Sequence, residues 1–378
     1  MSRPTIGFLI PRLGITDRGA EVFVYEIAQR LQADFDVVVW VRKSNNKSEL
    51  LGNLVKRGVT IRKVSCIPEQ HLIAKILYIF PFLRNIINKL HISPSEIEML
   101  SFSAACLPAL LSEKVDLLFP ANGVWGSILC RLIRTLKRTP FIYATLGGIE
   151  PVSLWQKPNM CIALFPSIER WLRKHFPYLR VCYISTGVDL KKFHPHGDKA
   201  FIDLPRPVFL TVSALVPEKE VDLTVRAVGR LKIGSLLVIG DGPLKSALVH
   251  LADTELGRGR YMFVSSGHSK LHKYYRAADV FAFSAPWETG WSIVFLEALA
   301  SGLPVVANKG ENLEYLLGKD WPLFCNVSNI NQYSRTLERA AKIKVVSRPL
   351  VQNYSWEKIA EQYKEIILGI ANDYKKKD

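Results

Sequence analysis

Cysteine and histidine are too few and too scattered in this sequence to build a disulfide framework or a metal centre. The six cysteines contain no C-x-x-C pair and no zinc-ligand spacing, and the eight histidines form no paired motif. Isolated thiols of this kind are typical of proteins from a reducing compartment. We therefore expect neither disulfides nor a bound metal ion.

Long hydrophobic runs are also missing. The amino-terminal apolar run ends at Pro11–Arg12, too early for a signal peptide. The longest run, Leu72–Ile87, is broken by two cations and a proline and is too short to span a bilayer. We expect a cytoplasmic protein that could lie on the inner face of the membrane. The apolar stripe of Leu72–Leu90, flanked by basic residues, fits either a core helix or a segment that contacts lipid.

Acidic residues are scarce relative to basic ones: 34 Asp and Glu oppose 50 Lys and Arg, for a net charge of +16. Residues 1–195 hold 26 basic and 14 acidic residues, whereas residues 196–378 hold 24 and 20. The surplus therefore belongs to the first half of the chain and predicts an anionic partner there, such as an acidic membrane surface. Nucleic acid is disfavoured because the basic stretches lack interleaved aromatic residues.

Short β-rich runs alternate with helical patterns along the whole chain, which predicts an α/β fold with parallel sheets covered on both faces. The alternation is interrupted by a linker around Gly187–Pro207 and then resumes. We predict an N-terminal domain of residues 1–195 and a C-terminal domain of residues 196–356. The amphipathic helix at residues 357–378 is expected to pack back on the first domain. Ligands of such sheets bind at the carboxyl ends of the strands.

The most informative segment is Phe281–Ala307, FAFSAPWETGWSIVFLEALASGLPVVA. A strand is predicted to end near Ser284, and a loop leads to Ser292, a plausible N-cap for a helix that stops before Gly302. This helix is apolar except for Glu297, whose burial would be costly without a donor. We expect its carboxylate either to reach solvent or to meet hydroxyl groups of a ligand. The helix N-terminus is a natural seat for phosphate.

This segment resembles the acidic signature of retaining glycosyltransferases of family 4, in which two glutamates precede an Ala-rich helix end and Gly-x-Pro-Val-Val. Other pieces resemble the same family in the expected order, and together they cover nearly the whole chain. These pieces are Gly19–Glu21, Ser185–Asp189 with Phe193–Pro195, Leu215–Lys219, Gly240–Leu244, Tyr274–Val280 and Ser355–Trp356.

The resemblance implies a GT-B fold, an α/β architecture with two Rossmann-like domains that face each other across a cleft. It also implies transfer of a sugar from a nucleotide-diphosphate sugar to a glycan or lipid-linked acceptor, without a metal or any cofactor beyond the donor substrate. The donor would bind to the C-terminal domain and the acceptor to the N-terminal domain.

Site residues follow from the same resemblance. Lys219 would neutralise the leaving diphosphate, and Glu288 would lie beside the sugar. Glu297 would accept hydrogen bonds from the ribose hydroxyls. On spacing alone, Lys219 could instead be a surface lysine, and the turn at Gly240 could serve only the backbone. The residues expected to bind the donor are Gly19, Gly240, His268, Gly290, Trp291, Ser292 and Glu297.

Several positions depart from the family pattern. Eight residues separate Glu288 from Glu297 instead of seven, Ala214 replaces the usual arginine, and Gly147 replaces the usual histidine. These departures leave a second interpretation open, in which the chain binds a sugar nucleotide or glycan without efficient transfer. A more distant alternative is another GT-B enzyme, such as a sugar-nucleotide epimerase.

Overall fold

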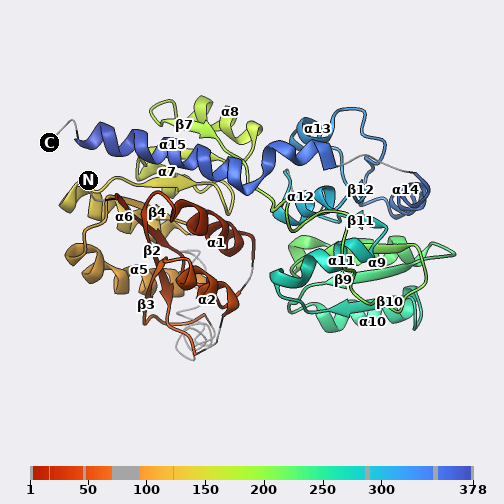
Figure 1. The fold of residues 1–378 in the computed structure, drawn as a ribbon. Coiled ribbons are helices and arrows are strands. Elements are labelled where there is room, and N and C mark those ends of the chain that lie inside the picture. The colour runs from red at the N-terminus through yellow and green to blue at the C-terminus, as the bar shows by residue number, and fades with distance from the viewer. Residues whose placement is uncertain are drawn as a thin grey trace, which may run out of the picture. The chain divides into compact units, whose positions relative to one another are not determined.

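The computed structural model of this chain describes residues 3–16, 18–45, 48–69, 93–121, 123–285, 290–343 and 348–375. They form two units (Figure 1). Unit 1 consists of Met1–Ser185 and Ile359–Asp378, and unit 2 consists of Thr186–Lys358. Each unit contains parallel β-sheet flanked by helices, which confirms the predicted α/β class. The predicted segment Leu72–Leu90 lies outside the described residues.

Unit 1 is built on parallel strands in two hydrogen-bonded groups, with orders β3-β2-β1-β4 and β5-β6-β7. The amide of Leu118 donates to the carbonyl of Pro140 at 3.0 Å, which links β4 to the chain entering β5. The strands are β1 (Thr5–Leu9), β2 (Asp36–Arg42), β3 (Thr60–Val64), β4 (Leu117–Pro120), β5 (Ile142–Ala144), β6 (Met160–Ala163) and β7 (Val181–Tyr183).

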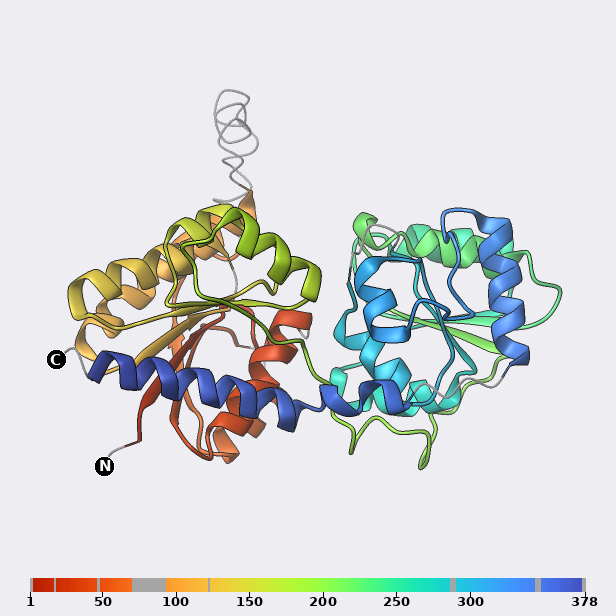
Figure 2. The same cartoon turned by 90° about the horizontal axis from the view of Figure 1, so that it is seen from above.

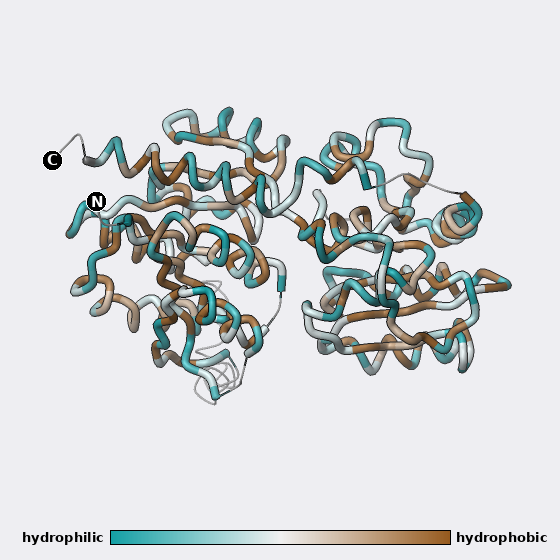
Figure 3. Tube along the Cα trace, viewed as in Figure 1, coloured by the Kyte–Doolittle hydropathy of each residue, from teal (hydrophilic) through white to brown (hydrophobic). Residues whose placement is uncertain are grey.

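Helices cover both faces of the unit 1 sheet (Figure 2). Apolar residues concentrate along the strands and on the inward sides of the helices, as the hydropathy colouring in Figure 3 shows. The helices are α1 (Gly19–Leu31), α2 (Glu49–Lys56), α5 (Pro94–Ser112), α6 (Val124–Lys137), α7 (Pro151–Trp155), α8 (Pro166–His175) and most of α15 (Trp356–Lys375).

The last helix contributes to the core of unit 1 although it is far away in sequence. The ring of Tyr363 on α15 packs against those of Phe23 and Phe119, with centroid distances of 5.6 and 6.0 Å. Further along, the side-chain amide of Asn159 donates to the hydroxyl of Tyr374 at 2.7 Å. Burying these large aromatic surfaces against the sheet stabilises the unit.

Unit 2 contains one five-stranded parallel sheet with the order β10-β9-β8-β11-β12. Its strands are β8 (Val208–Val212), β9 (Ser235–Ile239), β10 (Tyr261–Val264), β11 (Val280–Ala282) and β12 (Val305–Val306). Its helices are α9 (Val221–Gly229), α10 (Lys245–Glu255), α11 (Leu271–Ala277), α12 (Ile293–Ala300), α13 (Glu311–Leu317) and α14 (Ile330–Lys342), with 3-10 turns η1 (Pro217–Lys219), η2 (His268–Lys270) and η3 (Arg348–Tyr354).

The predicted linker packs on unit 2 through two arginines. Arg276 donates to the carbonyls of Lys192 and His194, and Arg348 donates to those of Leu190 and Phe193. Because a guanidinium carries five donors in a fixed fork, one side chain can satisfy several backbone carbonyls that have left regular structure. Residues 186–195, which the sequence analysis placed in the first domain, therefore belong with unit 2.

Two further features of the described residues concern the cysteines and the helices. All six cysteines are free, as their scattered spacing predicted. Within the described ranges, no helix has the length and apolar content needed to cross a membrane.

The linker is also paired with the chain that enters the last helix. The amide of Val188 donates to the carbonyl of Tyr354 at 2.8 Å, and the amide of Trp356 donates to that of Val188. At Gly187, a Cβ atom would lie 2.7 Å from the indole of Trp356, a side chain that is buried.

We expect Gly187→Ala to lower the free energy of unfolding by about 2 kcal/mol, because the buried indole must shift to admit the methyl group. Chemical denaturation of the full chain measures this. Gly52→Ala is the control: it lies within α2 with open space around its Cβ. It should be neutral or stabilising. Equal effects of the two substitutions would contradict the assigned contact.

Candidate functional site

The unit 2 sheet has a topological switch point between β8 and β11. Starting from β8, the chain builds the sheet outward through β9 and β10 and then returns to the other side of β8 with β11. The loops that follow β8 and β11 consequently lead to opposite faces of the sheet. In open parallel sheets this divergence leaves a crevice at the carboxyl ends of the strands, where ligands bind.

Lys219 lies in the loop that follows β8, at the end of the short turn η1. The hydroxyl of Ser284, just beyond β11, donates to the carbonyl of Lys219 at 2.9 Å. The next residue, Glu220, has a φ of 42°, in the left-handed region that is uncommon for residues other than glycine. This hydrogen bond therefore ties the two diverging loops together at the switch point and holds the half-buried Lys219 beside it.

The loop after β9 approaches the loop after β8 so closely that only glycine fits. A Cβ atom on Gly240 would lie 1.8 Å from the carbonyl oxygen of Ser213, and one on Gly242 would lie 2.4 Å from that of Leu215. The amide of Leu215 in turn donates to the carbonyl of Asp241 at 2.9 Å. The two glycines thus have a structural reason in backbone packing, and binding of a ligand by Gly240 stays a prediction.

A small polar cluster lies at the ends of β9 and β10. Asp241 accepts hydrogen bonds from the hydroxyl of Ser265 at 2.6 Å and from the amide of Gly242 at 2.8 Å, and the amine of Lys245 lies 3.3 Å away. These hydrogen bonds, that from Ser265 most strongly, lower the pKa of Asp241. The cluster is exposed and therefore accessible to a ligand at this edge of the sheet.

Helix α12 begins at this edge with an unusual N-terminus. Ser292 occupies the N-cap position as predicted, but its side chain accepts no capping hydrogen bond. Its hydroxyl is buried and has no partner among the described residues. The first amides of a helix have no partner inside the helix, so the start of α12 can offer backbone donors to a ligand. Trp291 is buried beside it, stacked on Tyr315 and edge-on to Tyr354.

Glu297 lies on α12 with 1% of its side chain exposed, and both carboxylate oxygens have partners within the protein. Nε2 of His268 lies 2.7 Å from Oε1, and the hydroxyl of Tyr275 donates to Oε2 at 3.0 Å. Burial and the neighbouring Glu297 raise the pKa of Tyr275 well above its usual value, so that its hydroxyl stays a donor. The expectation that only solvent or a ligand could satisfy this carboxylate was therefore wrong.

The structure says less about the other residues predicted to bind the donor or to act on the sugar. Glu288 lies outside the described residues. Gly290, which precedes Trp291, is buried. Gly19 begins α1 in unit 1, where a Cβ atom would meet open space, so packing does not require a glycine there. In the described part of the chain, no group of His, Cys, Asp and Glu side chains could hold a metal ion.

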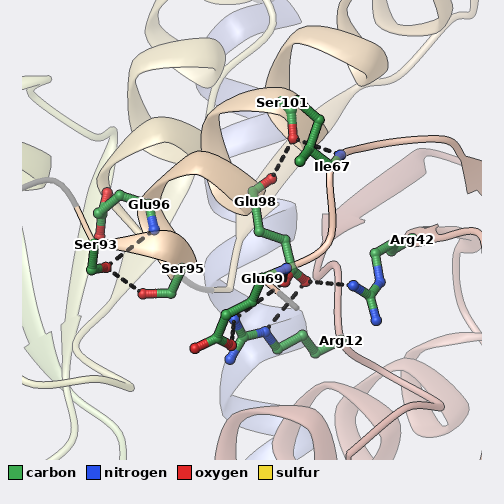
Figure 4. Close-up of polar contacts among 9 residues, drawn as sticks. All are labelled: Arg12, Arg42, Ile67, Glu69, Ser93, Ser95, Glu96, Glu98 and Ser101. Carbon is green, nitrogen blue, oxygen red and sulfur yellow. Dashed lines mark hydrogen bonds and ion pairs between the residues drawn. The ribbon is translucent and has the colours of Figure 1, made fainter. Parts of the chain in front are cut away.

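Unit 1 carries a buried charge network at the carboxyl ends of its first strands, shown in Figure 4. Glu98 on α5 is 1% exposed and lies 3.3 Å from the guanidinium of Arg12 and 3.5 Å from that of Arg42. It also accepts a hydrogen bond from the amide of Glu69 at 2.8 Å, and Glu69 pairs with Arg12 at 2.6 Å. Although burial opposes it, attraction to Glu98 raises the pKa of Arg12.

Sequence reasoning missed this network and the partners of Glu297. Glu98 stands between Ile97 and Met99, but Glu96 and several serines share its helix, so the signal is weaker than the one that drew attention to Glu297. Its arginine partners come from the ends of two strands, and nothing in their local sequence distinguishes them from surface cations. The general rule that a buried carboxylate requires a donor would have found the carboxylate but not its partners.

Comparison with protein families finds a match over residues 196–355 to the family described as "Glycosyl transferases group 1". A curated relative is the GDP-mannose-dependent alpha-(1-6)-phosphatidylinositol monomannoside mannosyltransferase of Mycolicibacterium smegmatis, 30% identical over 167 residues. That match covers 38% of this chain and 43% of the relative. The lipopolysaccharide core biosynthesis glycosyltransferase LpsE of Rhizobium meliloti is 27% identical over 45% of this chain and 53% of its own. The chain thus spans about half the length of the curated relatives it matches.

Solved structures resemble the fold over nearly the whole chain. Sucrose-phosphate synthase from Thermosynechococcus elongatus has a TM-score of 0.75 at 18% identity, covering 97% of this chain and 99% of that one. HepE from Anabaena in complex with UDP-glucose has a TM-score of 0.68 at 15% identity, with coverages of 97% and 99%. These likenesses confirm the predicted GT-B fold.

We expect Glu98→Gln to lower the free energy of unfolding by about 3–5 kcal/mol, because it leaves the Arg42 guanidinium without a counter-charge among the described residues and leaves Arg12 with Glu69 alone. Denaturant unfolding of the full chain measures this. The control is Glu113→Gln, which breaks a more exposed ion pair with Arg62 and should change stability by about 1 kcal/mol or less. A loss at Glu98 no larger than that at Glu113 would show that the network contributes little.

Proposed function

We propose that the chain is a retaining, metal-independent glycosyltransferase, because residues 196–355 match the family described as glycosyl transferases group 1. It moves a hexose from a nucleotide-diphosphate sugar to a glycan or lipid-linked acceptor, in the synthesis of a cell-envelope polysaccharide or glycolipid. The mannosyltransferase and lipopolysaccharide-core relatives support this class of reaction, and the UDP-glucose complex of HepE supports a nucleotide-sugar donor.

One observation carries the proposal: three features suited to a nucleotide sugar converge at the carboxyl edge of the unit 2 sheet. They are the Lys219 loop, the start of α12 with the Ser292 hydroxyl, which has no partner in the described part of the chain, and the buried pair of Glu297 and His268. A cation and the backbone donors of a helix N-terminus suit the diphosphate. A carboxylate and an imidazole suit the hydroxyl and N–H groups of the nucleoside.

These residues take the following roles in the proposed reaction. The bond between the anomeric carbon and the diphosphate oxygen breaks, and Lys219 together with the start of α12 stabilises the charge that develops on that oxygen. A hydroxyl oxygen of the acceptor takes its place on the same face of the sugar, and the proton of that hydroxyl passes to the leaving diphosphate oxygen. Glu288 lies beside the sugar. The backbone around Gly290–Ser292 holds phosphate, and Gly19 and Gly240 let the backbone approach the donor closely.

The acceptor side belongs to unit 1, which holds most of the positive charge. We propose that its exposed cations attract an acidic membrane face, where a lipid-linked acceptor would be found. Two cations of unit 1 are already engaged with backbone carbonyls: Arg134 donates to those of Gln156 and Lys157, and Lys137 to those of Leu110 and Glu113. Exposed positions such as Arg131 and Lys174 remain for the membrane.

A second candidate function is binding of a sugar nucleotide or glycan without efficient transfer. Ala214 and Gly147 favour it, because each removes a polar side chain that the family pattern places at the donor. A charge-assisted hydrogen bond contributes about 1.5–3 kcal/mol, so the missing arginine alone would slow transfer substantially unless another cation replaced it.

We expect UDP or GDP to raise the melting temperature of the full chain, and the matching nucleotide sugars to be hydrolysed slowly with release of the nucleotide. Lys219→Ala should weaken nucleotide binding by about 10–100-fold, the loss of one charge-assisted contact. Lys342→Ala is the control, because that exposed lysine of α14 pairs with Glu338.

The outcomes of this experiment separate the two functions. Binding without turnover, unchanged by Glu288→Gln, would favour the non-catalytic alternative. If no nucleotide raises the melting temperature, the donor site itself is misassigned.

We expect vesicles containing acidic lipid to sediment the protein at low salt and to release it at high salt, since screening weakens exposed charges. Arg131→Glu combined with Lys174→Glu should reduce partitioning by about tenfold or more. The matched control reverses two exposed cations of unit 2, Lys232 and Arg258, and should have little effect. Equal losses in both double variants would argue against a membrane surface on unit 1.

A further inference from the structure

Helix α5 of unit 1 carries no charge over most of its length. It runs from Pro94 to Ser112, and residues 99–112 include no Asp, Glu, Lys or Arg. A surface helix of a globular protein normally has charged residues on the side that faces water, and a helix that is apolar all round is normally buried. The composition of α5 therefore suits a helix that is covered on its outer side as well as its inner side.

The inner side of α5 is covered by unit 1 itself. Phe102 of α5 and Ile133 of α6 belong to one buried cluster, which also contains residues of the sheet. The two helices thus lie side by side on one face of that sheet (Figure 1). At their C-terminal ends, the amine of Lys137 on α6 donates to the carbonyl of Leu110 on α5 at 3.1 Å. The outer sides of α5 and α6 consequently form one continuous surface.

The outer side of α5 is exposed although it is apolar. Leu100 and Leu111 are separated by about three helical turns, so they lie on the same side of the helix. Their side chains are 45% and 42% exposed. Ala104 and Pro108, which lie between them in sequence, are exposed as well. This side of α5 therefore offers water only aliphatic groups.

Helix α6 extends the apolar surface. Leu132 and Leu136 are about one turn apart on this helix, and they are 42% and 59% exposed. We call Leu100, Leu111, Leu132 and Leu136 together the leucine face. Apolar side chains that gather on one exposed surface and are bordered by polar residues typically mark a contact with a partner protein or a membrane.

The charges around the leucine face are mainly positive. Residues 99–138 hold five basic and two acidic residues. Both acidic residues have partners, because Glu113 pairs with Arg62 and Asp116 accepts a hydrogen bond from a backbone amide. Arg131 on α6 is exposed. An apolar surface with a basic border fits an acidic bilayer, in which aliphatic side chains enter the interface and cations meet the headgroups.

A tryptophan lies beside α6 on the other side from α5. Trp155 ends α7 and is 62% exposed. Arg134 of α6 donates to the carbonyls of Gln156 and Lys157, and these bonds hold the chain that follows Trp155 against α6. Tryptophan is enriched at membrane–water interfaces, since its ring is apolar and its N–H group is polar.

A second copy of the chain fits the leucine face less well than a membrane does. A symmetric dimer places the same surface of both copies together, so the surplus cations of one copy would face those of the other. Juxtaposed like charges oppose association, whereas an anionic partner attracts the same cations.

We propose that the leucine face of α5 and α6 rests on an acidic bilayer, with its four leucines at the level of the lipid interface and the neighbouring cations at the headgroups. The inference rests on the proposed function and deepens it. Exposed cations attract the protein to an acidic surface, and the leucine face determines which side of unit 1 then contacts the lipid.

The first test is sedimentation of the full chain at low salt with vesicles of phosphatidylcholine and phosphatidylglycerol in equal amounts. Leu132→Gln combined with Leu136→Gln changes no charge. It should lower the partition coefficient by about tenfold or more, because less apolar area enters the interface. Leu100→Gln combined with Leu111→Gln should have a similar effect.

The matched control removes two exposed apolar side chains of unit 2. Phe201 and Ile233 are 91% and 66% exposed, more than any of the four leucines. Phe201→Gln combined with Ile233→Gln should leave the partition coefficient unchanged. A loss equal to that of the leucine variants would overturn the assignment of this face.

Fluorescence quenching gives a second readout that removes no apolar surface. Leu136→Trp adds a fluorophore to the leucine face, and Phe201→Trp adds one to unit 2. With acidic vesicles whose lipid chains are brominated near the headgroup, we expect the emission added by Leu136→Trp to be quenched and that added by Phe201→Trp to be unaffected. If the leucine-to-glutamine variants do not fold, this measurement decides.

The outcomes separate this inference from the proposed function. Undiminished binding of both leucine variants, or no quenching at Leu136→Trp, would overturn the leucine face and leave the attraction of unit 1 to membranes standing. A lipid-free dimer that Leu132→Gln with Leu136→Gln converts to a monomer would assign the face to a second copy instead. Failure of the wild-type chain to bind acidic vesicles would overturn both the inference and the membrane partner, while nucleotide binding still tests the glycosyltransferase proposal.

Discussion

A buried carboxylate must find donors, and this requirement organises the carboxyl edge of unit 2. Glu297 sits in a helix whose other side chains are apolar, where an unpaired charge would be too costly to keep. Its donors come from the turn after β10 and from α11, so pairing this one group joins three elements around the predicted donor site. The position of α12, and with it that of the Ser292 hydroxyl, depends on that pairing.

Unit 1 meets the same requirement with different chemistry. Glu98 is as deeply buried as Glu297, but its donors are two guanidinium groups and a backbone amide. Two cations, Arg12 and Arg42, meet two carboxylates, Glu98 and Glu69, near the ends of β1 and β2, whereas an imidazole and a phenol contact the single carboxylate of unit 2. The two units thus use different charged groups at the carboxyl ends of their strands, which is consistent with different ligands for each.

The alternation of apolar strands and amphipathic helices was enough to predict the fold class and the final helix. At Gly240 the sequence left a backbone role and donor binding both open. The structure adds a constraint that no local signal reveals, the contact of this loop with the carbonyl of Ser213.

Only part of the candidate site could be predicted from the sequence. Lys219, Ser292 and Glu297 lie in segments with a recognisable spacing, so their neighbourhood could be inferred from the chain. Their partners could not, because Tyr275 and Ser284 are separated from them by 22 and 65 residues and meet them only through the order of the strands. Sequence patterns indicate which groups need partners, while topology decides which groups provide them.

The position of α15 has a consequence for how the protein is made. Unit 2 is continuous in sequence and can fold as soon as its residues have left the ribosome. Unit 1 cannot complete its core at that stage, because Tyr363 must still pack against Phe23 and Phe119. Domains generally fold in the order of synthesis, the N-terminal one first. Here unit 1 completes its folding only after unit 2 has been synthesised, because it needs α15. Until then, unit 1 exposes the apolar surface that α15 will cover.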